Sequence, residues 1–432
     1  MTAILPDRRP DAPCGPRLLA GWFDTGAPAD HVEHVTRYGP LPREDLTRRA
    51  GRAELIATVE RAGLRGRGGG GFPTAHKLMA VAAARGPRTV VANGCEGDPG
   101  SVKDRVLLEL APHLVLDGIV LAAQTLRARA AMLCVAEGGL QVARLEDALA
   151  ERSDDPVAVR IVEVPERYTA SEETALVRFL TRGDARPTTT PPRPAQRGVH
   201  GRPTLVDNVE TLAHLALIAR FGADWYRECG TSAAPGTTLV TLGGAIWSPG
   251  VYEVEYGTSL GGVLDLAGGP AAPARAVLVG GLGGAWLALP TAAAVPFTPE
   301  ELRAAGARGG GVAALAVLPQ RACGLAETAR VLHYLATQSA RQCGPCMFGL
   351  PTVAADLSAL ADGTGGPRTL ARLGERLDVI RGRGACAHPD GAVALASSAL
   401  DVFADDVQGH VAGVPCSAAG LRASLPVPEV GS

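Results

Sequence analysis

A glycine-rich segment constrains this chain more than any other feature. Residues 63–74 read Gly-Leu-Arg-Gly-Arg-Gly-Gly-Gly-Gly-Phe-Pro-Thr, and Lys77 follows shortly after. Successive glycines let backbone N–H groups approach an anion closely, while Arg67 and Lys77 supply positive charge and the next helix adds its N-terminal dipole. The segment predicts a phosphate-binding loop. Glycine content alone fits a flexible loop with solvated arginines equally well.

Strand and helix patterns alternate after this loop. Apolar strands are predicted at 89–93, 132–135 and 157–164, with helices between them at 107–126 and 140–149. This alternation is typical of an α/β layer that holds a nucleotide-like ligand. The predicted domain covers residues 51–235. It follows a lead-in segment, residues 1–50, that shows no sustained periodicity.

The pattern changes in the second part of the chain. A strand at 239–246, a turn and an alternating strand at 252–256 predict a hairpin. A short helix over 258–269 and a strand at 276–279 follow. Together they predict a small ubiquitin-like β-grasp domain, of the SLBB type, over residues 236–318, which is expected to pack rather than catalyse.

The last part of the chain has helical periodicity. Four amphipathic patterns predict a C-terminal four-helix bundle over residues 319–412, before a tail of residues 413–432. The four helices are predicted at 325–335, 350–360, 370–380 and 393–407.

Composition excludes several classes of function. A formal net charge of -2 provides no basic field, which argues against nucleic acid as a partner. Apolar stretches end before the roughly 20 residues of a membrane span, so no direct membrane insertion is expected. Charged residues at 7–11 replace the apolar core of an export signal, which favours a cytoplasmic protein. Nine cysteines then indicate metal or thiol chemistry rather than a disulfide framework.

Three further motifs follow the glycine-rich loop in order. Residues 93–105 begin Asn-Gly-Cys-Glu-Gly-Asp-Pro-Gly, residues 171–176 read Ser-Glu-Glu-Thr-Ala-Leu, and residues 201–211 read Gly-Arg-Pro-Thr-Leu-Val-Asp-Asn-Val-Glu-Thr. With the loop, these segments closely resemble the NADH-oxidising FMN flavoprotein subunit of respiratory complex I (NADH-quinone oxidoreductase). The resemblance spans about residues 50–410 and identifies the chain as a divergent member.

The resemblance implies non-covalent FMN, with NADH or NADPH stacked on the flavin. The phosphate would meet Lys77 and the glycine amides, while Asn93 and Asn208 would meet the ring edge or ribityl chain. Glu172 and Glu173 would accept from ribose or nicotinamide groups, although Ser-Glu-Glu is also an ordinary helix start. The full predicted cofactor-binding set is Gly66, Arg67, Gly68, Gly69, Phe72, Lys77, Asn93, Glu96, Asp98, Glu172, Glu173, Asp207 and Asn208.

Departures from the family pattern concern the dinucleotide more than the flavin. Arg193 and Ala80 stand where aromatic residues are expected, which leaves Phe72 as the remaining stacking residue. Cys95 and Asp207 also replace the residues expected at their positions. Arg193 can contact an aromatic ring or pair with a phosphate, which would suit NADPH or a protein donor; a surface arginine is the alternative.

Three cysteines in the helical part match the family's iron–sulfur ligands. Cys343 and Cys346 lie in Cys-Gly-Pro-Cys, and Cys386 follows 40 residues after Cys346 (386 - 346). Soft thiolates suit iron, so the spacing favours a 4Fe-4S cluster, or a 3Fe-4S cluster because Ala340 stands in the first cysteine position. A thioredoxin-like dithiol and simple buried thiols are the alternatives.

The fourth cluster ligand stays open at this level. His388, Asp390, solvent or a cysteine of a partner are the candidates. Cys323 lies about five turns upstream on a predicted helix and fits poorly unless that helix is broken.

Together these patterns predict an electron-transfer flavoprotein, an NAD(P)H dehydrogenase. It would oxidise NADH or NADPH through FMN and pass electrons by the cluster to a separate protein acceptor, such as a ferredoxin-like protein. No catalytic side chain is assigned, because the sequence shows no persuasive nucleophile or His–carboxylate arrangement. The alternative is a non-catalytic electron-relay or docking subunit that keeps the fold and the cluster but has lost NADH oxidation.

Overall fold

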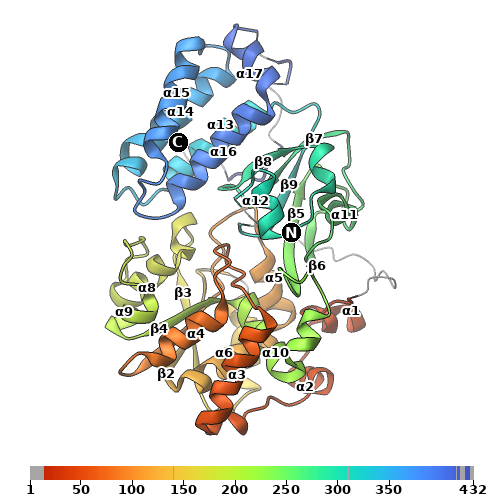
Figure 1. Ribbon diagram of the computed structural model, residues 1–432, viewed down its shortest axis with the longest axis vertical. Helices are drawn as coiled ribbons and strands as arrows, with labels where there is room; N and C mark the ends of the chain where they lie inside the picture. The colour runs from red at the N-terminus through yellow and green to blue at the C-terminus, as the bar shows by residue number, and fades with distance from the viewer. Residues whose placement is uncertain (1–13, 140, 309–310, 415, 419–423, 429–432) are drawn as a thin grey trace.

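The computed structural model describes residues 14–139, 141–308, 311–414, 416–418 and 424–428 (Figure 1). The chain forms a parallel sheet flanked by helices, a mixed five-stranded sheet, and a helical C-terminal part. In Figure 1 the C-terminal helices lie at the opposite end of the molecule from α3 and α6, with the second sheet between these regions.

The first sheet has four parallel strands in the order β3-β2-β1-β4. Apolar alternation is weak here because β1 is buried along its centre, as expected when helices cover both faces of a parallel sheet. The strands are β1 (Arg88–Asn93), β2 (Ala128–Ala136), β3 (Val159–Val164) and β4 (Thr204–Asn208). The helices of this part are α3 (Arg49–Ala62), α4 (Thr74–Ala83), α5 (Lys103–Leu110), α6 (Pro112–Leu126), α7 (Gln141–Ala150), α8 (Glu173–Arg182), α9 (Pro194–Arg197) and α10 (Val209–Arg227).

The α/β layer predicted from the alternation is confirmed, with one strand added. β1, β2 and β3 lie where apolar strands were expected. β4 was not predicted, because its five residues do not show a strand pattern alone. The segment becomes a strand by pairing with β1, and in this pairing Asn93 lies opposite Asn208.

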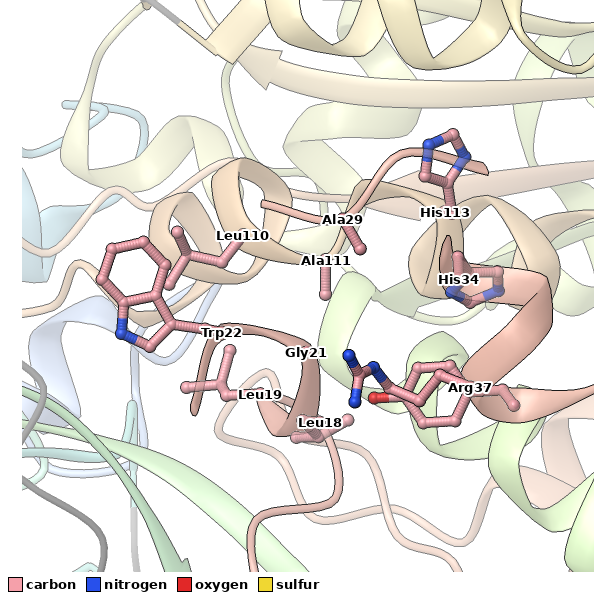
Figure 2. A pocket seen from close by; sticks show the side chains of 11 residues that line it. Leu18, Leu19, Gly21, Trp22, Ala29, His34, Arg37, Leu110, Ala111 and His113 are labelled. Carbon is pink, nitrogen blue, oxygen red and sulfur yellow. The ribbon is translucent and has the colours of Figure 1, made fainter. Parts of the chain in front are cut away.

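The N-terminal segment is more ordered than its lack of periodicity indicated. It contains α1 (Ala20–Thr25) and α2 (His31–Tyr38), and a capping box of Asp30 and Glu33 begins α2. Figure 2 shows residues of this segment facing Leu110, Ala111 and His113 around a small cavity. Residues 14–50 of the predicted lead-in therefore pack against the first folded unit.

A buried carboxylate holds α2 in place. The His34 ring lies 2.7 Å from Asp117 of α6, and Arg152 donates to the same carboxylate at 2.7 Å. Arg220 of α10 also contacts it. Burial alone would raise the pKa of Asp117, but the His34 hydrogen bond and the charges of Arg220 and Arg152 hold it well below its ordinary value. The N-terminal segment is thus tied to both core helices.

The second sheet has the order β6-β5-β9-β7-β8. The predicted hairpin is confirmed as an antiparallel pair, and Ser259 caps the short helix that follows by accepting from the Gly262 N–H. β9 runs parallel to β5 at the centre of the sheet. The elements are β5 (Thr237–Gly244), β6 (Gly250–Glu255), α11 (Leu260–Asp265), β7 (Ala274–Val279), β8 (Ala285–Ala288), α12 (Pro299–Ala304) and β9 (Ala314–Pro319).

The C-terminal part contains helices at the four predicted places, but the last pattern is divided. The helix expected over 393–407 ends at Val402, and a separate helix begins after Phe403, whose side chain is buried. Leu425, in the segment expected to be a tail, is also buried in this core. The helices are α13 (Gly324–Thr337), α14 (Leu350–Ala361), α15 (Pro367–Ile380), α16 (His388–Val402) and α17 (Ala404–Val411).

A disulfide is a further long-range feature of the fold. Cys14 and Cys229 form a disulfide that joins the N-terminal segment to the residues after α10, a link that the sequence did not predict.

No single helix in the described ranges is long and apolar enough to cross a membrane. The consecutive pair α5 and α6 has sufficient combined length and hydropathy, but it is bent by 96° and α6 is packed in the core.

A buried glutamate joins the two sheets. Glu210, at the start of α10, accepts hydrogen bonds from the Thr238 hydroxyl (2.9 Å) and the Leu239 N–H (3.0 Å) of β5. Lys103 of α5 donates to it at 2.8 Å, and the Arg67 guanidinium lies 3.6 Å away. Burial alone would raise the pKa of Glu210, but Lys103, His214 and Arg67 hold it well below its ordinary value. The carboxylate therefore stays ionised.

We expect Glu210→Gln to lower the free energy of unfolding by about 3–5 kcal/mol, because it leaves buried cations without their carboxylate. Urea denaturation followed by circular dichroism measures the change. Glu60→Gln, at an exposed position on α3, is the control and should shift stability by less than about 0.5 kcal/mol. Equal midpoints for the two variants would contradict the role of Glu210.

Candidate functional site

The glycine-rich segment forms a closed loop between α3 and α4. The Gly66 N–H donates to the Phe72 carbonyl, and the Thr74 N–H donates to the Leu64 carbonyl, both at 2.9 Å. Gly69 has a φ of +96°, a conformation that side chains rarely adopt. A Cβ added at Gly70 would meet nothing within 4 Å, so this face of the loop is open. The loop leads directly into the N-terminus of α4, which favours an anion.

Two strands of the first sheet end beside this loop. Because β1 and β4 are parallel, Asn93 and Asn208 lie side by side at the carboxyl edge, where ligands of α/β sheets bind. A Cβ at Gly68 would lie 3.4 Å from the Asn208 Cβ, so the loop passes close over this edge. The Asn208 amide donates to Asp104 at 2.6 Å, and the Asn93 amide donates to the Ser171 carbonyl at 2.8 Å.

Lys77 projects from α4 towards the same edge. Its ammonium donates to the Val206 carbonyl at 2.8 Å and lies 3.6 Å from both Asp207 and Glu173. Burial by itself lowers the pKa of Lys77, but the charges of Asp207 and Glu173 raise it above the ordinary value. Asp207 Oδ2 is buried and has no hydrogen-bond partner among the described residues. The site thus offers a charged donor beside a buried acceptor.

These groups surround a cavity of about 620 Å³, within the usual size range of cofactor pockets. It opens between the loop, the ends of β1 and β4, and the start of α8. The predicted cofactor-binding residues that line it are Gly66, Gly68, Gly69, Phe72, Lys77, Asn93, Glu172, Glu173, Asp207 and Asn208.

Three predicted residues have structural contacts instead. The Arg67 guanidinium is buried beneath the loop, where it donates to the Tyr226 hydroxyl (2.8 Å) and the Thr237 carbonyl (3.0 Å). Glu96 accepts from the N–H groups of Asp104 and Arg105, both at 3.0 Å, and so caps α5. The side chains of Arg67 and Glu96 therefore stabilise the walls of the site, not its ligand face.

Asp98 is the third of these residues. It accepts from the Leu282 N–H at 2.8 Å, which links the acidic segment to the second sheet, and from the Tyr168 hydroxyl at 3.2 Å. Burial raises the pKa of Asp98 to about 6, although the hydrogen bonds lower it. Asp98 is not among the residues that line the cavity.

The paired glutamates lie at the start of α8, beside the cavity. Glu172 accepts from the N–H groups of Thr174 (2.9 Å) and Ala175 (3.1 Å), which makes it the N-cap of α8. Both glutamates also line the cavity. Burial raises the pKa of Glu172, despite the opposing hydrogen bonds of its capping partners.

Several lining residues were not identified from the sequence. Arg308 reaches the cavity from the segment between α12 and β9, more than 200 residues after the loop, and only the packing of the two sheets brings it there. His76 is one turn after Phe72, with ring centroids 6.1 Å apart. Arg193, noted as a departure from the family pattern, lines the cavity at the start of α9, and Ala80 lines it from α4.

The three predicted cluster cysteines lie on two segments of the C-terminal part. Cys343 precedes the single π-helical turn η5 (Pro345–Gly349), which carries Cys346, and Cys386 precedes α16. Burial, together with the nearby thiols of Cys343 and Cys386, raises the pKa of Cys346 to about 12. Burial also raises the pKa of Cys386, and the nearby Glu172 carboxylate and Cys343 thiol contribute to this increase. Ala387, the residue after Cys386, lines the cavity.

The structure narrows the candidates for a fourth cluster ligand. Cys323 caps the far end of α13 and lies beside His410, so it belongs to another cluster of side chains. His388 Nε2 lies 2.8 Å from the Leu335 carbonyl, and Asp390 accepts from the Gly382 N–H at 2.7 Å. Each has one protein partner, but His388 Nδ1 is buried without a hydrogen-bond partner among the described residues. His388, Asp390, solvent and a partner protein's cysteine therefore stay candidates.

Both halves of this site match known protein families. Residues 59–217 match the Nuo51 FMN-binding domain, and residues 326–410 match the NADH-ubiquinone oxidoreductase-F iron-sulfur binding region. The first match spans the loop and the ends of β1 and β4, and the second spans all three predicted cluster cysteines.

Individual relatives agree with these matches. The chain is 32% identical over 386 residues to the NADH-quinone oxidoreductase F subunit of Streptomyces coelicolor, covering 84% of each chain. It is 33% identical over 379 residues to the Escherichia coli F subunit, covering 83% of this chain and 84% of the relative. It is 32% identical over 383 residues to the NADP-reducing hydrogenase HndC subunit of Solidesulfovibrio fructosivorans, covering 85% and 78%.

A solved structure is also similar. A chain of an NAD+-reducing [NiFe]-hydrogenase in the H2-reduced state superposes with a TM-score of 0.81 at 31% identity, covering 92% of this chain and 67% of that one. The predicted membership is thus confirmed: the chain belongs to the NADH-quinone oxidoreductase F-subunit family of FMN- and iron–sulfur-dependent oxidoreductases.

Proposed function

We propose that this chain oxidises NADH or NADPH at the cavity and transfers the electrons through the three-cysteine site to a separate protein. The single observation that carries this proposal is the continuity of the two sites. The cavity has the loop and Lys77 on one side and Ala387 on another, and Ala387 adjoins Cys386. A cofactor in the cavity would therefore lie next to a cysteine of the cluster.

The cavity fits FMN in size and in chemistry. The open face of the loop at Gly70, the start of α4 and the charged Lys77 would hold its phosphate. Asp207 Oδ2, buried without a partner among the described residues, needs a donor that a flavin ring N–H or a ribityl hydroxyl would supply. Asn93 would orient the ring from the edge of the sheet. When bound, FMN would accept a hydride and release single electrons.

Cys343, Cys346 and Cys386 fit an iron–sulfur cluster. Two thiols of one segment and one of another can surround a single cluster, while an isolated dithiol would not need Cys386. The motif also follows a helix and not a strand, unlike the dithiol of thioredoxin-like proteins. We infer a 4Fe-4S cluster with one non-cysteine or partner ligand, or a 3Fe-4S cluster, because Ala340 replaces the first cysteine.

The dinucleotide would occupy the outer part of the cavity. Phe72 is 44% exposed and provides a stacking face there. Arg193 and Arg308 place two guanidinium groups on the lining, which suit the phosphates of NADH or the additional phosphate of NADPH. Glu172 and Glu173 would accept hydrogen bonds from ribose or amide groups. The arginines would thus recognise the phosphates of the ligand, and the carboxylates would recognise its hydroxyl groups.

We also propose three domains with the boundaries that the sequence predicts. The second sheet supports a ubiquitin-like β-grasp over residues 236–318: a hairpin, a helix, and a last strand inserted parallel to the first. Four long helices support a bundle over residues 319–412, with α17 as an added short helix. The flavin domain would cover residues 51–235, together with the packed segment from residue 14.

The partners follow from the relatives, two of which are named subunits of a quinone oxidoreductase and of a hydrogenase. We infer that this chain works in a larger assembly, with a separate iron–sulfur protein, such as a ferredoxin-like one, as acceptor. A cytoplasmic location is supported by the seven cysteines that are free in the structure, since an oxidising compartment favours disulfides.

An anaerobic titration tests the central proposal. Protein loaded with FMN should lose its flavin absorbance when NADH or NADPH is added, because the cavity brings donor and flavin together. Bound FMN that neither dinucleotide bleaches, but that dithionite does, would contradict the dehydrogenase proposal. That result would support the alternative of an electron-relay or docking subunit, which the replacement of an aromatic residue by Arg193 favours.

We expect Lys77→Ala to weaken FMN binding by about ten- to a hundredfold, since a charged hydrogen bond contributes about 1.5–3 kcal/mol. Quenching of flavin fluorescence during titration measures the affinity. Arg85→Ala removes an exposed cation just after the same helix and should leave the affinity unchanged. An identical dissociation constant for wild type and Lys77→Ala would exclude Lys77 from the phosphate site.

We expect Arg193→Phe to strengthen NADH binding by about two- to tenfold, because aromatic stacking contributes about 0.5–1.5 kcal/mol. NADPH binding should weaken if Arg193 meets its additional phosphate. Equilibrium titrations with both dinucleotides measure the effects. Arg197→Phe, on the same short helix, is the control because it is exposed outside the cavity lining. Coincident titrations of wild type and Arg193→Phe would show that this residue does not contact the dinucleotide.

A further inference from the structure

We propose that Cys323, His410 and Cys416 bind a single zinc-like divalent metal ion, separate from the iron–sulfur cluster. Their ligand atoms all lie within 4.8 Å of one another, and no other trio of His, Cys, Asp or Glu side chains in the described part of the chain is so close. Cys323 and His410 are buried, while Cys416 is partly exposed. Two sulfurs and one imidazole nitrogen form a ligand set typical of zinc.

The imidazole of His410 is oriented as a metal ligand. Its Nδ1 lies 3.1 Å from the Leu360 carbonyl, which can only accept, so Nδ1 carries the proton. The lone pair is then on Nε2, which lies 3.8 Å from the Cys323 sulfur. A backbone carbonyl on the distal nitrogen is the usual support of a zinc-bound histidine. His410 is fully buried, so this orientation is held by packing.

The distances are close to those of a tetrahedral site. Zn–S bonds of about 2.3 Å place two ligand sulfurs about 3.7 Å apart, so the three atoms would need to approach by about 1 Å at most. At present the Cys416 N–H donates to His410 Nε2 at 3.0 Å, a contact that the metal would replace. Because Cys416 is partly exposed, a water molecule can supply the fourth ligand.

This site is distinct from the three-cysteine site. Cys323 is the N-cap of α13, whose 14 residues span about 21 Å and end just before the segment that carries Cys343. The metal would join three separate elements: the junction between β9 and α13, the helix α17, and the segment after it. Near the same place, Arg275 of β7 pairs with Asp406 of α17 at 2.9 Å. The metal would therefore fasten the C-terminal helices to the second sheet.

Metal analysis of variants tests the proposal. The full chain, purified anaerobically with reductant and supplied with zinc, should contain about one zinc in addition to cluster iron. Cys416→Ser should lose the zinc and keep the iron and the visible absorbance. Cys386→Ser should lose cluster iron and keep the zinc. Cys134→Ala, which removes a buried free thiol elsewhere, should keep both metals.

Cobalt provides a second readout that does not depend on stability. Cobalt(II) added to the wild-type protein should give the thiolate charge-transfer and tetrahedral absorption bands, and these should be absent in Cys416→Ser. Zinc content that is equal in wild type and Cys416→Ser would overturn the proposal. A Cys323–Cys416 disulfide in the anaerobically reduced protein, detected by mass spectrometry, would also overturn it. Loss of flavin or cluster activity alone would bear only on the proposed oxidation reaction.

Discussion

The buried carboxylate of Glu210 is the interaction on which the rest of the structure depends. Glu210 lies in the first turn of α10, just after β4, and it accepts hydrogen bonds from β5 of the second sheet. Lys103 and Arg67 supply the positive charge that makes an ionised group tolerable at this depth. Since Arg67 belongs to the glycine-rich loop, this single carboxylate sets the position of the loop relative to both sheets.

The ligand cavity follows from this arrangement. With Arg67 held below, the open face of the loop points towards the carboxyl edge of β1 and β4. Lys77 and Asp207 then lie 3.6 Å apart at that edge, and Cys386 approaches from the C-terminal helices. The arrangement is one of positioning rather than acid–base catalysis, which agrees with a family whose cofactors carry the chemistry. Arg193 and Arg308 also line this cavity.

Much of the fold was predictable because local patterns report local structure. Short apolar runs located β1, β2 and β3, alternating residues located the β5–β6 hairpin, and helical periodicity located the C-terminal helices. The failures have physical causes. β4 is too short to show a period by itself, and α2 depends on the buried Asp117 for its position. Phe403 divides a continuous helical pattern, and its side chain is buried in the core.

The sequence by itself determined which chemistry is available: glycine amides beside Lys77, asparagines at strand ends, and three cysteines at cluster spacing. Only the tertiary structure decided which groups face the ligand. It turned Arg67, Glu96 and Asp98 into supports, brought Arg308 to the cavity, and assembled Cys323 with His410 and Cys416. The physical reason is that residue type and spacing are local properties, whereas the direction of a side chain depends on packing between segments far apart in the chain.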